Sequence, residues 1–172
     1  MRVFGLAVAA ALVLAVALRA ETAWGEAKDG LKLGIEYVSA ADGGVIRVLV
    51  RNVSSIPMDP EAGHEGLGGL REFAQFSAVR SDGDGGVIKI FDRAIAGIGP
   101  SAMIAMGLYV GAGETRVVVF PVKDLFYLSG RSAAPLATLV RQGCRLRVTG
   151  LFWGGLLRLE TPWIPARGAA GR

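Results

Sequence analysis

The chain has 172 residues, of which 52% are hydrophobic and 20% charged, so it is too apolar for a disordered protein and long enough for one domain. Arg2 and Arg19 precede the first acidic residue, Glu21, and the rest of the chain carries 17 basic and 15 acidic residues. This near balance argues against a nucleic-acid partner, because nucleic-acid binding needs a concentrated basic face.

The N-terminus has the features of a signal peptide. Arg2 supplies a positive charge, and residues 3–18 are an unbroken run of apolar residues and glycine. The small residues of Gly25-Glu26-Ala27 fit the positions that a signal peptidase reads. Ala20 and Ala23 are other cleavage points, for which Leu18 and Glu21 fit the upstream position less well. We therefore predict a signal peptide over residues 1–27, cleaved between residues 20 and 27.

The alternative to a cleaved leader is an uncleaved membrane anchor. The apolar run has 16 residues, whereas a membrane-spanning helix needs about 20. We therefore predict no transmembrane helix in the mature form. The abundance of Ala, Gly and Arg is typical of a GC-rich bacterial genome, so the predicted destination is the periplasm or the exterior.

The body of the chain alternates apolar and polar residues with a period of two, which is the spacing of half-buried strands. Pro121 indicates an edge strand or a strand end, because proline cannot donate a hydrogen bond within a sheet. Pro135 and Gly143 are placed to begin and end a short helix over residues 135–142. The predicted strands are residues 31–37, 45–53, 73–80, 87–91 and 116–122, and the third and fourth of them are expected to form a hairpin.

The clearest unit is a second hairpin, in which residues 145–153 and 156–163 are joined by Gly154-Gly155. Adjacent glycines suit a two-residue type I′ turn, which needs positive φ at both positions. The resulting register puts Phe152 opposite Leu157. The inward face is predicted to contain Leu146, Val148, Gly150, Phe152, Leu157, Leu159, Thr161 and Trp163.

These patterns predict an all-β fold: an antiparallel β-sandwich of about seven to eight strands over residues 28–165, with a disordered tail over residues 166–172. In residues 46–55 a strand is followed by Asn52 and a turn, and Gly113-Glu114-Thr115 precedes a β-branched strand. Both motifs resemble those of bacterial exported immunoglobulin-like domains. The resemblance implies an immunoglobulin-like sandwich and no shared catalytic residues.

The residue types that catalysis and metal binding need are sparse. His64 is the only histidine, so the chain lacks a serine triad, and no cofactor is predicted because no cofactor motif occurs. Asp59, Glu61 and His64 are only weak candidates for a metal site, since zinc prefers several Cys or His. Cys144 is the only cysteine; we expect a buried thiol, with an intermolecular disulfide as the alternative.

The outward face of the last hairpin is the predicted binding site. Leu151, Trp153 and Leu156 are expected to form an apolar patch beside Arg147 and Arg158, and aromatic residues with arginine are typical interface anchors. The alternative is that another loop covers this patch.

The sequence therefore predicts a non-enzymatic exported binding or structural module that acts on a protein or cell-envelope component. The alternative is a carboxylate-dependent hydrolase of envelope polymers, which needs two acids about 5–10 Å apart in a cleft, drawn from Glu36, Asp92 and Glu160. A third hypothesis is a subunit that completes its sheet with a partner's strand, which requires an unpaired strand edge.

Overall fold

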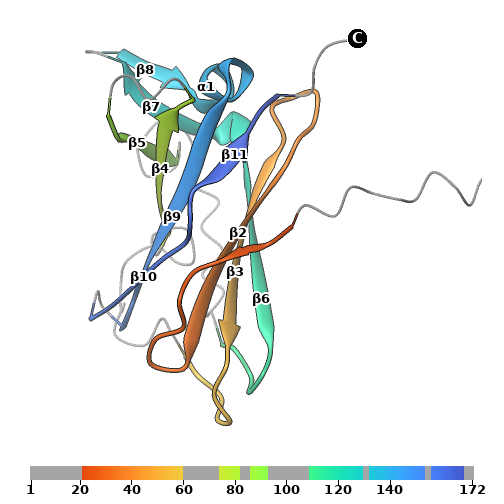
Figure 1. The fold of residues 1–172 in the computed structure, drawn as a ribbon, viewed down its shortest axis with the longest axis vertical. Coiled ribbons are helices and arrows are strands. Elements are labelled where there is room, and N and C mark those ends of the chain that lie inside the picture. Colours follow the sequence, from red (N-terminus) through yellow and green to blue (C-terminus); the bar gives the residue numbers. More distant parts are fainter. Residues whose placement is uncertain are drawn as a thin grey trace, which may run out of the picture.

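The computed structural model describes residues 21–59, 74–81, 86–92, 109–129, 132–153 and 156–168. These residues form two antiparallel β-sheets, one of four strands and one of seven, that lie face to face (Figure 1). The all-β, sandwich-like fold expected from the sequence is therefore confirmed.

The smaller sheet has the strand order β1-β2-β3-β6. Gly43 and Gly44, both with positive φ, lie in the connection between β2 and β3. β6 pairs with the far edge of β3, so Pro121 ends an edge strand, as its ring requires. The strands are β1 (Ala23–Trp24), β2 (Leu31–Val38), β3 (Val45–Asn52) and β6 (Thr115–Pro121).

The larger sheet has the order β10-β9-β4-β5-β7-β8, and β11 also pairs with β9. β4 and β5 form the first predicted hairpin, with Phe76 opposite Ile90. β9 pairs with β4, which is distant in sequence, and thereby joins the C-terminal hairpin to the rest of the sheet. The strands are β4 (Ala74–Arg80), β5 (Ile88–Asp92), β7 (Leu125–Ser129), β8 (Ser132–Pro135), β9 (Cys144–Phe152), β10 (Leu157–Glu160) and β11 (Ile164–Ala166).

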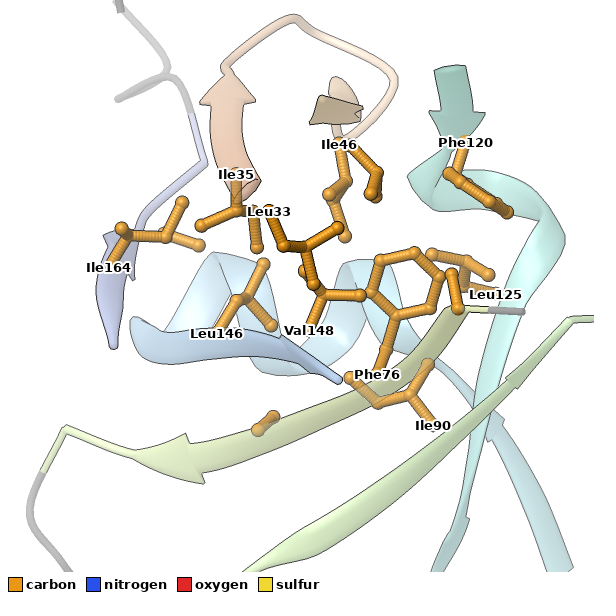
Figure 2. Packing of buried hydrophobic residues seen from close by; sticks show 14 of the residues in the cluster. Leu33, Ile35, Ile46, Phe76, Ile90, Phe120, Leu125, Leu146, Val148 and Ile164 are labelled. Carbon is orange, nitrogen blue, oxygen red and sulfur yellow. The ribbon is translucent and has the colours of Figure 1, made fainter. Parts of the chain in front are cut away.

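The inward side chains of both sheets form one hydrophobic core. The rings of Phe76 on β4 and Phe120 on β6 meet edge to face across the two sheets, with centroids 4.8 Å apart. Figure 2 shows the core side chains pointing toward one another, among them Leu33, Ile35 and Ile46 from the smaller sheet and Leu146 and Val148 from the larger.

Short helices lie where the chain leaves β6 and β8. The 3-10 helix η1 (Val122–Asp124) follows β6, and α1 (Leu136–Gln142) follows β8 and buries Leu136, Leu139 and Val140. α1 ends at Gly143, whose φ of 85° suits a residue without a side chain, so the predicted helix and its end are confirmed. In the part of the chain that the structure describes, neither helix has the length and apolarity to cross a membrane.

Two boundaries differ from the sequence-based expectation. β1 lies at residues 23–24, within the range of residues 20–27 in which the cleavage point was left open. β11 extends to Ala166, which was assigned to the tail but is fully buried opposite Cys144. The described residues contain eleven strands rather than seven or eight. β1, β8 and β11 have only two to four residues each, too few to show a period of two in the sequence.

Candidate binding surfaces

The last hairpin forms in the predicted register. Phe152 pairs with Leu157 and Gly150 with Leu159, so the residues between them face away from the core. Gly154 and Gly155 lie outside the described residues, and the turn type stays a prediction. The outer face of the hairpin carries Arg145, Arg147, Thr149 and Leu151 on β9 and Arg158 and Glu160 on β10.

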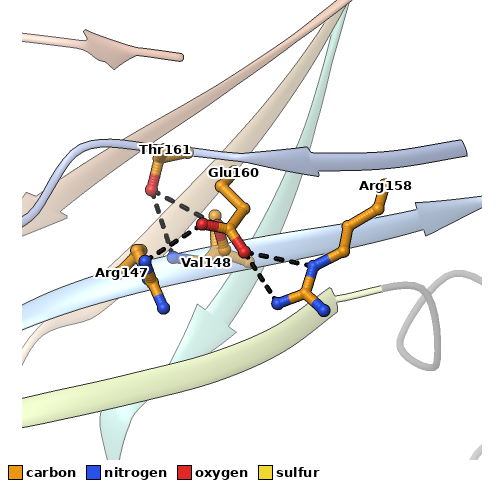
Figure 3. A network of polar contacts seen from close by, with 5 residues as sticks. All are labelled: Arg147, Val148, Arg158, Glu160 and Thr161. Atoms are coloured by element: carbon orange, nitrogen blue, oxygen red, sulfur yellow. Dashed lines mark hydrogen bonds and ion pairs between the residues drawn. The ribbon is translucent and has the colours of Figure 1, made fainter. Parts of the chain in front are cut away.

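Glu160 joins the two arginines of the predicted binding site (Figure 3). Its Oε2 accepts a hydrogen bond from Arg147 Nη1 at 3.0 Å. Its Oε1 accepts from Arg158 Nη2 at 2.7 Å and from Arg158 Nε at 3.1 Å. Charged pairs of this geometry are the stronger hydrogen bonds of proteins. One carboxylate thus serves two guanidinium groups, and the cluster keeps a net positive charge.

Trp163 was expected to face the core, and the structure corrects this. The Cζ atom of Arg147 lies 4.8 Å from the centroid of the Trp163 ring, a cation–π contact on the outer face. Thr161 does face inward, where its Oγ1 accepts a hydrogen bond from the Val148 N–H at 3.1 Å. The alternation fails at Trp163 because it lies between β10 and β11, outside either strand.

The apolar residues of the predicted site have different environments. Trp153 is half-buried, has a φ of 49° and donates a hydrogen bond from Nε1 to the carbonyl of Asp59 at 3.0 Å. Leu151 is half-buried opposite Arg158. Leu156, by contrast, is 90% exposed. Arg147, Leu151 and Arg158 therefore share the outer face, whereas Trp153 packs against the hydrophobic core and is partly covered, as the alternative interpretation expected.

A second apolar area lies on the same face of the larger sheet, over β5 and β7, and sequence reasoning missed it. We call Phe91, Phe126 and Leu128 the aromatic patch. Phe91 lies directly opposite Phe126 in the strand register, and Leu128 follows on the same face of β7. Phe91 is 37% exposed and Leu128 is 61% exposed. The same register puts Lys89 of β5 opposite Leu128, so a cation flanks the patch.

β6 leaves one edge of the smaller sheet unpaired among the residues that the structure describes (Figure 1). At the two ends of its ladder with β3, Asn52 N–H donates to the Glu114 carbonyl and Val122 N–H donates to the Gly44 carbonyl. Hydrogen-bonding direction alternates along an antiparallel strand. The even-numbered residues of β6 therefore bond to β3, and the odd-numbered residues direct their backbone groups away from it.

The outward groups of β6 follow from this alternation. Thr115, Val117 and Val119 each present an N–H and a carbonyl, whereas Pro121 presents a carbonyl alone. The side chains of Val117 and Val119 are 50% and 46% exposed. Among the described strands, β6 thus has the unpaired edge that the third sequence hypothesis requires.

The carboxylates considered for hydrolysis do not form one pair. Glu36 lies on the outer face of the smaller sheet, where it accepts a hydrogen bond from Thr22 and pairs with Arg47 at 3.5 Å. Glu160 lies on the outer face of the larger sheet. Because the core separates these faces, the two acids cannot flank a common substrate bond. The side chain of Asp92 lies outside the described residues.

The metal and thiol expectations have different outcomes. Of the weak metal candidates, Glu61 and His64 lie outside the described residues. Asp59 is described, so the structure does not test whether the three residues lie together. No group of three or more His, Cys, Asp or Glu residues in the described ranges is arranged to hold a metal ion. Cys144 is fully buried, as predicted, and burial raises the pKa of its thiol to about 11.

Comparisons with known proteins found no matching family model, no similar curated protein and no similar solved structure. The candidate surfaces therefore depend on geometry alone. The aromatic patch had one local signal in the sequence, the alternation of Phe126 and Leu128 around the buried Tyr127. Phe126 lies opposite Phe91 only because β5 and β7 are adjacent in the sheet. The pattern of apolar residues along each strand does not specify which strands are adjacent.

Proposed function

We propose that this chain is a non-enzymatic exported binding module, which uses the outer face of the larger sheet to bind a protein in the periplasm or outside the cell. The observation that carries the proposal is the aromatic patch, in which Phe91 and Leu128 are exposed on a sheet face that also bears cations. Exposed apolar residues grouped on one face are typical of interaction sites, whereas scattered ones are not.

Charge indicates the chemistry of the partner. Lys89, Arg145 and Arg158 are exposed on this face, and Arg147 is partly exposed. Glu160 is the only acidic side chain described there, and it is shared by two arginines. An apolar protein surface with acidic groups at its rim would complement this face, because charge complementarity steers association and rejects wrong partners.

A site-specific cross-linking experiment tests this surface. A photoreactive amino acid replaces Leu128 in the full chain, expressed in its native cells, and the matched control replaces Val53, which is 48% exposed at the end of β3. We expect Leu128 to yield one discrete protein adduct that Val53 does not yield. Lys89→Glu combined with Arg158→Glu should remove the adduct. Equal labelling from both positions, or adducts with lipid alone, would contradict a protein-binding face.

We also propose that the fold is of the immunoglobulin-like type, and one structural observation supports this proposal. The two motifs that carry the resemblance, the turn after β3 and the turn before β6, lie side by side. Asn52 Nδ2 donates a hydrogen bond to the Val110 carbonyl at 3.1 Å, and the Asn52 backbone N–H donates to the Glu114 carbonyl. Asn52 is fully buried, and its Oδ1 accepts from the N–H and the hydroxyl of Ser54. The asparagine therefore fastens the turn after β3 to the turn before β6.

The unpaired edge of β6 favours a second candidate function, in which the smaller sheet is completed by β6 of a second copy. When two β6 strands pair antiparallel about Val118, Val117 lies opposite the partner's Val119 and Thr115 lies opposite the partner's Pro121. All six outward N–H groups then meet carbonyls, and the missing N–H of each proline falls at an end of the ladder. The exposed valines become cross-strand neighbours, a stabilising arrangement.

Charge exchange at this edge tests the second candidate. One form carries Val117→Lys and Val119→Lys, and the other carries Val117→Glu and Val119→Glu. In sedimentation velocity the unmodified protein should be a dimer, each charged form a monomer, and their mixture a dimer again. A monomeric unmodified protein, or dimers that persist in each charged form, would exclude pairing through β6.

A further inference from the structure

The segment from Thr22 to Gly25 belongs to the folded body of the protein. Ala23 and Trp24 form β1 and pair with Ile35 and Gly34 of β2. Ala23 also contacts the hydrophobic core. The first strand of the smaller sheet therefore lies upstream of residue 27, within the segment that the leader pattern assigns to the signal peptide.

Side-chain and backbone contacts fasten the same segment at both ends. Thr22 Oγ1 donates a hydrogen bond to Glu36, and Gly25 N–H donates to the Leu33 carbonyl at 2.8 Å. A side chain at residue 25 would place its Cβ 1.9 Å from the carbonyl oxygen of Glu160, so Gly25 sits tightly against the larger sheet. The segment from Thr22 to Gly25 thus contacts both sheets, β2 through its strand and β10 through Gly25.

The Trp24 ring covers β2. A Cβ atom built on Gly34 would lie 2.8 Å from the ring, and Lys32 Nζ lies 5.7 Å from the ring centroid. Cleavage after Ala27 would remove all these contacts, and cleavage after Ala23 would divide β1. Only a cut upstream of Thr22 keeps both β1 and the hydrogen bond from Thr22 to Glu36.

We propose that the export signal is cleaved after Ala20, so that the mature protein begins at Glu21. This inference rests on the proposed export of the chain. The host's signal peptidase would add water across the Ala20–Glu21 amide bond, leaving a carboxylate on Ala20 and an α-amino group on Glu21. Ala20 is the small residue that such an enzyme requires at the cleavage position, and it follows the apolar run of residues 3–18 closely, whereas Leu18 is larger than the small residue preferred two positions upstream.

Intact-mass analysis of the exported product tests the cleavage site. The full chain is expressed with its own leader in a bacterial host, and the periplasmic fraction is analysed. A product of residues 21–172 supports the inference, and a product of residues 28–172 overturns it while leaving export intact. An uncleaved chain that stays in the cytoplasm overturns the export proposal, and the inference with it.

Two substitutions provide a matched pair for the same measurement. Ala20→Glu places a large charged residue at the proposed cleavage position, and Ala27→Glu does so at the rival position. We expect loss of the 21–172 product from Ala20→Glu and unchanged processing of Ala27→Glu. The reverse result would assign cleavage to Ala27.

The stability of the two rival mature chains gives a readout that does not depend on export. Residues 21–172 and 28–172 are produced directly in the cytoplasm and melted under identical conditions. We expect a lower melting temperature for residues 28–172, since that chain lacks β1 and exposes Leu33 and Ile35 at the sheet edge. Equal melting temperatures would show that β1 contributes nothing to the fold and would remove the structural basis of the inference.

Discussion

On the outer faces of the two sheets, two outward-pointing leucines differ in how far they are exposed to solvent. Leu49 points away from the core on β3, yet it is only 8% exposed. It lies opposite Gly34, and the Trp24 ring occupies the space that a side chain at Gly34 would fill. Leu128 points outward on the larger sheet and is 61% exposed. The difference shows that a two-residue strand, β1, covers the outer face of the smaller sheet around Leu49, whereas Val117 and Val119 on β6 of that face stay 50% and 46% exposed. No described segment covers Leu128 on the larger sheet.

Among the substitutions predicted here, one in the core between the two sheets should change the stability of the protein most. Phe120→Ala should lower the free energy of unfolding by about 3–5 kcal/mol, because Phe120 is 1% exposed and its loss leaves a cavity beside Phe76. Urea denaturation followed by tryptophan fluorescence measures the change. Val119→Ala is the control, since Val119 is the preceding residue but is 46% exposed, and its effect should stay within about 0.5 kcal/mol.

A matched pair of leucines tests the comparison directly. Leu49→Ala should destabilise the protein by about 2–3 kcal/mol, since Leu49 is buried although it faces outward. Leu128→Ala should change stability by no more than about 0.5 kcal/mol, since its side chain already contacts water. Similar losses at both positions, measured by the same denaturation assay, would mean that the two outer faces are covered alike.

The sequence predicted the elements of the fold better than their neighbours. Period-two alternation located β2, β3, β4, β5, β6 and β9 to within about one residue and β10 to within about three, because each strand buries one of its faces in the core. The last hairpin was predicted in register, and β4 and β5 were predicted to form a hairpin without a stated register. The pairing of β4 with β9 and of β5 with β7 joins segments distant in sequence, and no local pattern specifies it.

The candidate surfaces were harder to predict than the strands for the same reason. Arg147, Leu151 and Arg158 were placed on the correct face, because hairpin register alone decides this. Their partners were not predicted: Trp163 covers Arg147 only because the chain leaves the strand pattern after β10. Trp24 was assigned to the signal peptide, because a two-residue strand is too short to show a period of two. Its position over Gly34 of β2 was therefore not predicted.

The buried thiol of Cys144 on β9 gives a third test, through the pH dependence of stability. The unfolded Cys144 thiol ionises near its ordinary pKa of 9.0, and burial raises the pKa of the folded thiol to about 11. Between these values the unfolded state has lost a proton that the folded state keeps, so stability falls as pH rises. The loss should reach about 2 kcal/mol by pH 11.

Cys144→Ala separates this effect from other groups that titrate in the same range. Burial also raises the pKa of Tyr37, so some alkaline loss of stability should remain in the variant. Denaturation curves from pH 8 to about 11 for both proteins give the contribution of the thiol as a difference in slope. Identical slopes would mean that the thiol ionises equally well in the folded protein and is not enclosed by the core.

The smallest expected effect concerns the charges of the two outer faces. Glu160→Gln should cost no more than about 1 kcal/mol, although Glu160 binds two arginines, because the side chains of Glu160 and Arg158 are 37% and 62% exposed. Glu36→Gln should cost even less, because its ion pair with Arg47 is longer, at 3.5 Å, and glutamine keeps an acceptor for Thr22. Added salt should shrink the Glu160 effect more than the Glu36 effect in unfolding experiments, because exposed charges are screened and the Glu36 side chain is only 12% exposed.

Glu160→Gln also separates stability from binding. The substitution leaves Arg147 and Arg158 in place but removes the carboxylate that neutralises part of their charge. If the larger sheet's outer face binds an acidic partner, cross-linking from Leu128 should increase in Glu160→Gln and stay unchanged in Glu36→Gln, whose charge lies on the opposite face. A loss of cross-linking in Glu160→Gln would mean that the carboxylate itself, rather than the arginines it holds, contacts the partner.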